Sequence, residues 1–378
     1  MNPTLGNFHS LVQSLEAQCA RPFSYLDERW TASEEWHRKA RDRVAELLAY
    51  SPPSLPLDAR VEEVTEDEGL VVERITWAQP HGPRTEAYLL RPADAKGPLP
   101  GVVALHDHSG YYFWGKEKVV GLPGEPGSVT ALKEAEYGGR SWANDLARRG
   151  YVVLAHDVFL WGSRKLDPAS LPAEAVASLA GLPPGSEEYL KTYHQMMYPY
   201  ETLVAKSLFL SGSTWPGIMA WEDRRAVDYL AGRPEVDATR LGCGGLSGGG
   251  LRSLVLAALD PRIRTAVVAG FMSTAAEVLA DKIARHTWMF HLPGLSALMD
   301  LPDLASLHGP LPLLVQYDSD DPLWTLTGQT QADERLARVY AKLGAPKAYE
   351  GRFYPGPHKF DRPMQADAFD WFDRWLAP

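Results

Sequence analysis

The stretch Gly245-Leu246-Ser247-Gly248-Gly249 constrains this chain more than any other. It follows residues 240–244, which read as a short buried strand, and precedes residues 251–259, whose Leu, Val and Ala content favours a helix. Glycines two positions before and after a serine remove side chains that would clash in a sharp turn from strand to helix. The pattern G-x-S-x-G is typical of a nucleophile elbow, in which the serine has a positive φ and its hydroxyl stands clear of the sheet.

Other glycine-rich loops fit this stretch less well. A dinucleotide-binding loop read from Gly242 and Gly244 would need a third glycine at position 247, which is a serine. A phosphate-binding P-loop would need Gly-Lys-Ser/Thr, which the stretch does not contain. A purely structural glycine turn stays open as the alternative.

Proteins with this elbow carry an acid and then a histidine downstream of the serine. Residues 312–317 are an apolar strand that runs directly into three carboxylates, Asp318, Asp320 and Asp321. A loop rich in proline and glycine at residues 354–360 holds His358, and no later residue is a histidine. A carboxylate at the end of that strand can hold the imidazole of His358, so the chain supplies both partners in the required order.

Taken together, these motifs resemble those of the α/β-hydrolase superfamily, close to its dienelactone-hydrolase-like and acetyl-xylan-esterase-like branch. The resemblance covers roughly residues 61–378. It rests on residues 105–110 for an oxyanion loop, 245–249 for the elbow, 320–323 for the acid turn and 356–358 for the base, with support from residues 149–157 and 161–164. Dienelactone hydrolases proper carry a cysteine nucleophile where this chain has Ser247, which favours ordinary carboxylic esters over dienelactones.

The resemblance implies a fold and a set of roles. It implies an α/β-hydrolase fold, with a mostly parallel sheet flanked by helices, and a serine esterase that needs no cofactor. Ser247 would be the nucleophile and His358 the base. Aligning Pro322-Leu323 with the family pattern selects Asp321 as the acid, although Asp318 then occupies a place usually held by a small residue. Asp318 would be a hydrogen-bonding residue at the strand terminus and Asp320 a solvated one.

The tetrahedral oxyanion of such an esterase needs two backbone N–H donors. Gly248 should supply one, and His108 or Asp107 the other. The same branch suggests sugar esters, such as acetylated or glucuronoyl saccharides, as substrates. Aromatic side chains suit stacking on a sugar ring, and the substrate-pocket candidates are Tyr111, Trp114, Tyr198 and Trp288.

Two rival functions from other classes stay open. His106 and His108 form an H-x-H pair at a strand end and could hold a metal in a metal-dependent hydrolase, although no further cluster with ligand spacing follows nearby. A non-catalytic binding protein could retain the fold. Structurally, His106 would anchor the loop, and Lys116 and Lys118 would be solvated charges.

The chain divides into a predicted N-terminal helical extension, residues 1–60, and a catalytic domain, residues 61–378. Within the extension, Trp36, Ala40, Val44, Leu47 and Leu48 fall on one face of a helix over residues 33–50. Residues 70–77 and 85–91 predict a hairpin at the sheet edge. Alternating strands and helices then follow, which indicates a mostly parallel sheet whose strand ends carry the chemistry.

Two long connections interrupt this alternation. Residues 159–216 exceed a simple strand-to-helix connection and predict a cap. Five prolines should break this cap into short pieces: Pro168, Pro172, Pro183, Pro184 and Pro199. A second excursion covers residues 272–310 and should lie near the site.

Composition excludes some partners. The 378 residues carry 38 basic and 48 acidic side chains and a formal net charge of −10, without basic runs, which argues against nucleic acid or an anionic membrane as a partner. Cys19 and Cys243 lie far apart, so a disulfide is not expected. The N-terminal residues contain no continuous apolar run, and we expect a cytoplasmic enzyme acting on a small-molecule ester.

Overall fold

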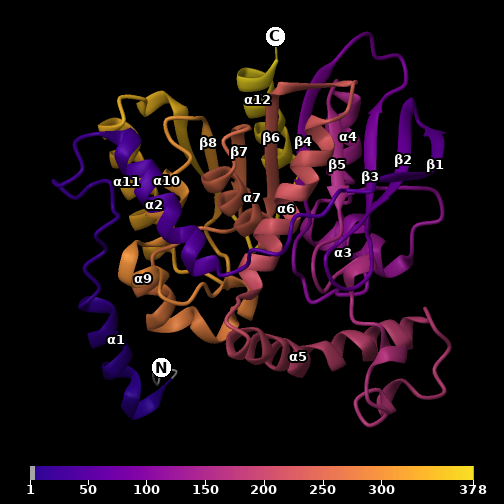
Figure 1. Cartoon of the computed structure of the whole chain (residues 1–378), viewed down its shortest axis with the longest axis horizontal. Coiled ribbons are helices and arrows are strands. Elements are labelled where there is room, and N and C mark those ends of the chain that lie inside the picture. The colour runs from indigo at the N-terminus through magenta and orange to yellow at the C-terminus, as the bar shows by residue number, and fades with distance from the viewer. Residues whose placement is uncertain (1–4, 378) are drawn as a thin grey trace.

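A mixed sheet organises residues 5–377, the part of the chain that the computed structural model describes (Figure 1). Within these residues nine strands lie in the order β1-β2-β3-β5-β4-β6-β7-β8-β9. The pairs from β1 to β5 are antiparallel, and those from β5 through β4 to β9 are parallel. The strands are β1 (Arg60–Asp67), β2 (Leu70–Trp77), β3 (Thr85–Pro92), β4 (Leu99–Leu105), β5 (Val152–His156), β6 (Val236–Leu246), β7 (Ile263–Ala269), β8 (Leu313–Asp318) and β9 (Tyr349–Tyr354).

Helices cover both faces of this sheet and bury two apolar cores. One core joins α2, α6, α7, α10 and α11 to the sheet, and the other joins α4 and α12 to the opposite face. The helices are α1 (His9–Ala17), α2 (Ser33–Leu48), α3 (Gly127–Glu136), α4 (Trp142–Arg148), α5 (Glu187–Leu210), α6 (Trp215–Ala231), α7 (Gly248–Leu259), α8 (Ala275–Glu277), α9 (Leu295–Leu298), α10 (Leu301–Ser306), α11 (Leu326–Lys342) and α12 (Arg362–Leu376). The predicted layering, a mostly parallel sheet flanked by helices, is confirmed.

The predicted hairpin is present but is not the edge of the sheet. Strands β2 and β3 pair antiparallel from Leu70–Pro92 to Trp77–Thr85, as expected. Strand β1 pairs with the outer side of β2 and forms the edge instead. The sequence concealed β1 because its side chains are almost all exposed, so it carries none of the apolar alternation that marks a half-buried strand.

The insertion between β5 and α6 consists of short 3₁₀ turns up to residue 186, as its prolines predict, and then of one long helix, which Pro199 does not break. Helix α5 runs for 24 residues with Pro199 in its interior, and Figure 1 shows it beyond the ends of the strands. Proline removes one backbone N–H donor and disfavours a helix interior. Here the buried side chains of Tyr193, Met196 and Met197 pack into the main apolar core and outweigh that local cost.

The N-terminal extension packs onto the main core. Trp36, Ala40, Val44 and Leu48 of α2 are buried in the same apolar cluster as the sheet, and Leu47 is partly buried against it, so the predicted helical face is confirmed. The Trp36 indole donates a hydrogen bond to the Phe23 carbonyl oxygen, which fastens the helix to the preceding loop.

None of the helices described within residues 5–377 combines the length and apolar character needed to cross a membrane. Cys19 and Cys243 are both free thiols. The cytoplasmic location stays a prediction.

The turn between β6 and α7 depends on close backbone packing against the end of β4. A β-carbon on Gly245 or on Gly249 would collide with the carbonyl oxygen of Leu105. Because the obstacle is backbone within the sheet, it cannot move aside as a flexible side chain would. Helix α7 can therefore begin directly beside β4 only when both positions are glycine.

We predict that Gly249→Ala lowers the free energy of unfolding by about 1–3 kcal/mol, the usual cost of overpacking. Gly232→Ala is the matched control, because its β-carbon would lie 3.4 Å from the nearest heavy atom, the Asp228 carbonyl oxygen, at a φ of −83°. Urea denaturation measures both. Equal stabilities for the two variants would contradict the packing argument.

Candidate active site

Ser247 occupies a strained turn between β6 and α7. Its φ of 56° and ψ of −116° lie outside the regions that side-chain-bearing residues prefer, a strain that costs about 1–3 kcal/mol. The turn is fixed on both sides, because the Ser247 N–H donates to the Ala269 carbonyl oxygen at 2.9 Å and the Leu251 N–H donates to the Ser247 carbonyl oxygen at 2.9 Å. The predicted strand, turn and helix are thus present, with the serine at positive φ.

Asp321 and His358 come together from two neighbouring strand ends. The loop after β8 carries Asp321, and the loop after β9 carries His358. The imidazole Nδ1 lies 2.6 Å from the Asp321 Oδ2 atom, and the other carboxylate oxygen accepts the Leu323 N–H at 2.8 Å. The Nε2 atom of His358 is buried and has no hydrogen-bond partner within residues 5–377.

The environment of His358 favours its charged form. Burial alone lowers the pKa of the imidazole, but the hydrogen bond to Asp321 and the charge of that carboxylate outweigh burial and raise the pKa above its usual value. The aspartate is 4% exposed, so its charge is weakly screened.

The three neighbouring aspartates differ in environment. Asp318 accepts the Lys359 N–H at 3.1 Å, and burial raises its pKa to about 7. Asp320 is exposed and accepts the Gly356 N–H at 2.8 Å. Of the three, Asp321 is the one whose carboxylate contacts the imidazole.

The loop after β4 approaches the start of α7. A β-carbon built on Gly248 would lie 2.9 Å from the backbone nitrogen of His108. The Gly248 N–H, at the first position of α7, has no acceptor within its own helix. Two backbone N–H groups therefore border the serine turn from two different segments.

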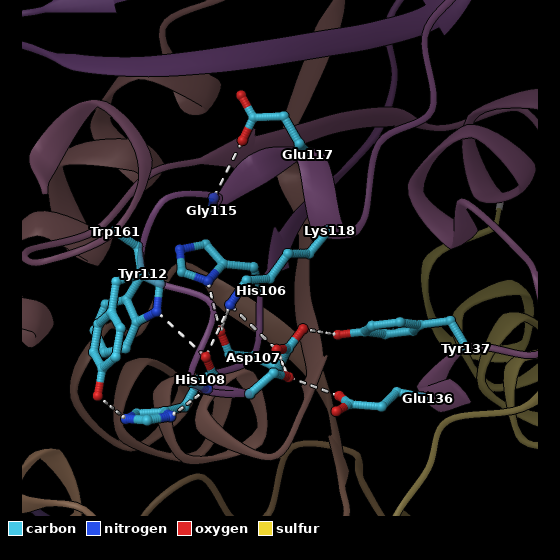
Figure 2. Close-up of polar contacts among 12 residues, drawn as sticks. His106, Asp107, His108, Tyr112, Gly115, Glu117, Lys118, Glu136, Tyr137 and Trp161 are labelled. Atoms are coloured by element: carbon cyan, nitrogen blue, oxygen red, sulfur yellow. Dashed lines mark hydrogen bonds and ion pairs between the residues drawn. The ribbon is translucent and has the colours of Figure 1, made fainter. Parts of the chain in front are cut away.

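Asp107 is oriented differently from His108. The carbonyl oxygen of His106 accepts a bond from Arg252 of α7 at 3.2 Å, so the N–H of the same trans peptide, which belongs to Asp107, points away from that helix. The Asp107 carboxylate is buried and accepts bonds from Tyr137, Ser109 and Lys118 (Figure 2). Burial raises its pKa, but Lys118 and these bonds reverse the effect and lower the pKa below its usual value. Asp107 thus anchors the loop.

A cavity of about 490 Å³ gathers these groups. Its lining includes Ser247, Gly248, His108 and His358. A second cavity of about 590 Å³ shares Ser109, Gly110 and Tyr198 with the first.

The predicted pocket residues are only partly brought together. Tyr198 lines both cavities, and Tyr111 lines the second. Trp114 and Trp288 do not line the first cavity. The Trp114 indole donates to Ser128 at 3.3 Å and the Trp288 indole to Thr202 at 3.1 Å. The cavity is also lined by Phe271 and Trp324, which the sequence analysis did not single out, and by Phe290 of the excursion over residues 272–310, which was expected near the site.

The positions of Phe271 and Trp324 in the chain could have identified them as cavity-lining residues. Phe271 follows the end of β7 by two residues, and Trp324 follows directly on the Pro322-Leu323 turn. Side chains just beyond the carboxyl ends of parallel strands commonly line the site.

Glu201 links the inserted helix α5 to the loop after β4, a link that the sequence gave no reason to expect. Its Oε1 atom lies 2.6 Å from the His108 Nε2 atom and also accepts the Tyr112 hydroxyl at 2.6 Å. Its Oε2 atom accepts the Thr287 hydroxyl at 2.9 Å. Burial raises the pKa of Glu201, but the bonds with His108 and these hydroxyls outweigh it and lower the pKa.

The prediction that Lys116 and Lys118 are solvated is wrong. They lie on a 3₁₀ turn, Lys116–Lys118, and are 2% and 0% exposed. The Lys116 ammonium pairs with the carboxylates of Asp157, Glu117 and Glu86 at 3.0, 2.7 and 3.4 Å. Lys118 contacts Asp107 and the backbone of the loop (Figure 2). Paired charges of this kind can be buried, which residue type alone does not show.

The structure does not support a metal centre on His106 and His108. Nδ1 of His106 lies 2.9 Å from the Asp107 carbonyl oxygen, and Nε2 of His108 is occupied by Glu201. Within residues 5–377 the one group of three His, Cys, Asp or Glu side chains close enough to share a metal is Asp318, Asp321 and His358. That group contains the carboxylate–imidazole pair already described and neither residue of the H-x-H motif.

A mostly parallel sheet with a serine turn after β6, an aspartate after β8 and a histidine after β9 is the arrangement of the α/β-hydrolase fold. Comparison with solved structures shows the same fold. The chain matches a "putative acetyl xylan esterase" from Bacteroides fragilis NCTC 9343 with a TM-score of 0.69 and 16% identity, over 93% of this chain and 84% of that one. It matches the glucuronoyl esterase from Solibacter usitatus with a TM-score of 0.62 and 16% identity, over 91% and 94% of the two chains.

A sequence relative extends over most of the chain. "Putative hydrolase YtaP" of Bacillus subtilis (strain 168) is 25% identical over 337 residues, which are 89% of this chain and 98% of that protein. No family model matches the chain.

We predict that Asp321→Asn lowers kcat for the proposed ester hydrolysis by up to about four orders of magnitude, because the imidazole loses the carboxylate that fixes its tautomer and stabilises its charge. The same change lowers the pKa of His358, so the rise of kcat/KM with pH shifts to lower pH. Asp320→Asn is the control and keeps most of the activity. Steady-state kinetics across pH measures both variants, and a crippled Asp320→Asn beside an active Asp321→Asn would transfer the role to Asp320.

Proposed function

We propose that this protein is a serine hydrolase that cleaves carboxylic esters through an acyl-enzyme, with Ser247, His358 and Asp321 as its catalytic triad. One observation carries the proposal. His358 is bonded to Asp321 through Nδ1, keeps a buried Nε2 without a partner, and lines the same cavity as the strained Ser247. Activation of a serine hydroxyl requires an imidazole that is oriented through Nδ1 by a carboxylate and whose Nε2 can accept the serine proton.

The chemistry follows from these roles. His358 Nε2 takes the Ser247 hydroxyl proton as Oγ bonds to the ester carbonyl carbon, and the carbonyl π electrons move to oxygen. When the tetrahedral intermediate collapses, the bond to the leaving oxygen breaks and the imidazolium returns its proton to the departing alcohol. Water then repeats the two steps on the acyl-enzyme, which releases the acid and restores Ser247.

The oxyanion of each intermediate would be held by the N–H groups of Gly248 and His108. Their proximity across the serine turn supports this assignment. Of the two predicted second donors, His108 is favoured over Asp107, because the Asp107 N–H points away from α7. Fixed backbone donors are effective here because they need no reorganisation as charge develops.

Sugar esters are the substrates we propose, in particular acetylated or glucuronoyl saccharides. The fold is similar to that of a protein named "putative acetyl xylan esterase" and to that of a glucuronoyl esterase. The cavity also offers aromatic side chains, among them Tyr198, Phe290 and Trp324, on which a ring can stack. The fold by itself does not choose the substrate.

We predict that a fluorophosphonate forms one adduct, on the peptide that contains Ser247, and that Ser247→Ala abolishes both labelling and hydrolysis of p-nitrophenyl esters. Peptide mass spectrometry locates the adduct, and hydrolysis rates are compared across p-nitrophenyl acyl esters, acetylated xylosides and a glucuronate methyl ester. Labelling that persists in Ser247→Ala would sink the assignment of the nucleophile. Activity that a chelator abolishes while the phosphonate leaves it untouched would instead favour a metal-dependent enzyme.

We predict that Tyr198→Ala changes the ranking of acyl and alcohol groups more than it changes the melting temperature, because Tyr198 is 60% exposed and lines both cavities. Trp114→Ala is the aromatic control outside the first cavity and should leave the ranking unchanged. The measurement is kcat/KM across the ester panel with thermal unfolding of each variant. A uniform loss on all substrates together with a fall in stability would show that Tyr198 only packs.

A further inference from the structure

The ammonium of Lys118 is buried against the backbone of the oxyanion loop. Its Nζ atom donates to the carbonyl oxygens of Asp107 and His108, each at 2.9 Å, and lies 3.3 Å from the Asp107 Oδ2 atom (Figure 2). These three acceptors match the three protons of an ammonium group. The Trp161 indole also donates to the His108 carbonyl oxygen at 3.3 Å, and its ring lies 5.9 Å from the Lys118 Nζ atom.

Binding one side of a peptide group fixes its other side. The Asp107 carbonyl and the His108 N–H belong to the same planar, trans peptide and point in opposite directions. Because the ammonium holds the carbonyl oxygen, the His108 N–H points away from Lys118. The nitrogen of that group is the one that lies 2.9 Å from a β-carbon built on Gly248, beside the serine turn.

We propose that Lys118 is a positioning residue for ester hydrolysis, which aims the His108 N–H into the oxyanion hole and strengthens it as a donor. A cation on the oxygen of a peptide draws electron density from its N–H, and chained hydrogen bonds reinforce each other where water is excluded. This inference rests on the proposed serine esterase, whose oxyanion would accept that N–H.

Lys116 shows that burial of a lysine on this turn does not by itself imply such a role. Its ammonium pairs with the carboxylates of Asp157, Glu117 and Glu86 and, among the residues that the structure describes, makes no hydrogen bond to the backbone of residues 106–110. Both lysines belong to the same 3₁₀ turn and are nearly fully buried. Substitution of either removes a paired buried charge, so Lys116 controls for the structural cost.

The test compares Lys118→Met with Lys116→Met. Each is assayed with p-nitrophenyl acetate and with trifluoroacetophenone as a transition-state mimic. The Ser247 oxygen adds to the ketone carbon, the carbonyl π electrons move to oxygen, and the serine proton passes to His358, so the hemiketal oxyanion occupies the hole. Deleting one oxyanion donor costs about 10²–10³ in kcat, and a misaimed donor should cost about 10–100-fold.

We expect Lys118→Met to lower kcat by about 10–100-fold and to leave KM within about twofold. Trifluoroacetophenone binding should weaken in proportion to the loss of kcat/KM. Lys116→Met should keep kcat and inhibitor affinity near those of the wild type, whatever its melting temperature. Unchanged kcat and inhibitor affinity in a folded Lys118→Met would overturn the inference and leave the esterase standing. So would equal losses in both methionine variants, which would mark a purely structural role.

Two further outcomes are distinguishable. If Lys118→Met does not fold, Lys118→Gln decides by the same two ratios, because its amide keeps two donors for the carbonyl oxygens but lacks the charge. A folded Lys118→Gln with wild-type kcat and inhibitor affinity would show that the charge of Lys118 is not needed. It would overturn the claim that Lys118 strengthens the His108 N–H as a donor and leave only the claim that residue 118 orients it. A wild-type protein that neither hydrolyses esters nor binds the ketone would overturn the proposed function, and this inference with it.

Discussion

The carbonyl oxygen of Leu105 lies where a β-carbon of Gly245 or Gly249 would have to be, and the rest of the site depends on that close approach. Because both positions are glycine, the first turn of α7 packs against the end of β4. The serine turn therefore lies next to the loop after β4. Ser247 then adopts a positive φ because the chain must reverse direction there. The strain of that turn is held by a rigid sheet, which is how strained residues persist at functional sites.

Buried charges then hold the loop after β4 in place. Lys118 binds its carbonyl oxygens, the Asp107 carboxylate gathers hydroxyl donors, and Glu201 reaches from α5 to the ring of His108. Such groups are expensive to remove from water unless they are fully paired. Since the pairs cross from the inserted helix and the 3₁₀ turn to one short loop, they fix the direction of its backbone N–H groups better than apolar packing would.

Most of the features that the sequence predicted correctly depend on local motifs. The elbow, the hairpin strands and the pairing of Asp321 with His358 were predictable because each depends on a short stretch with a distinctive composition and order. Helix α5 was not, because the packing of its apolar face, seen only in the folded chain, overrides Pro199. The burial of Lys118 was equally hidden, because its acceptors lie ten and eleven residues away and no local pattern brings them together.

A covalent acyl-enzyme on Ser247 can be detected by rapid-quench mass spectrometry during hydrolysis of p-nitrophenyl acetate. We expect an acetyl group to build up on the peptide containing Ser247 to at most about one per chain, in step with a burst of p-nitrophenol, and to disappear once substrate is exhausted. Steady hydrolysis with no acetyl group on that peptide at any quench time, or with the acetyl group on a different residue, would contradict this expectation.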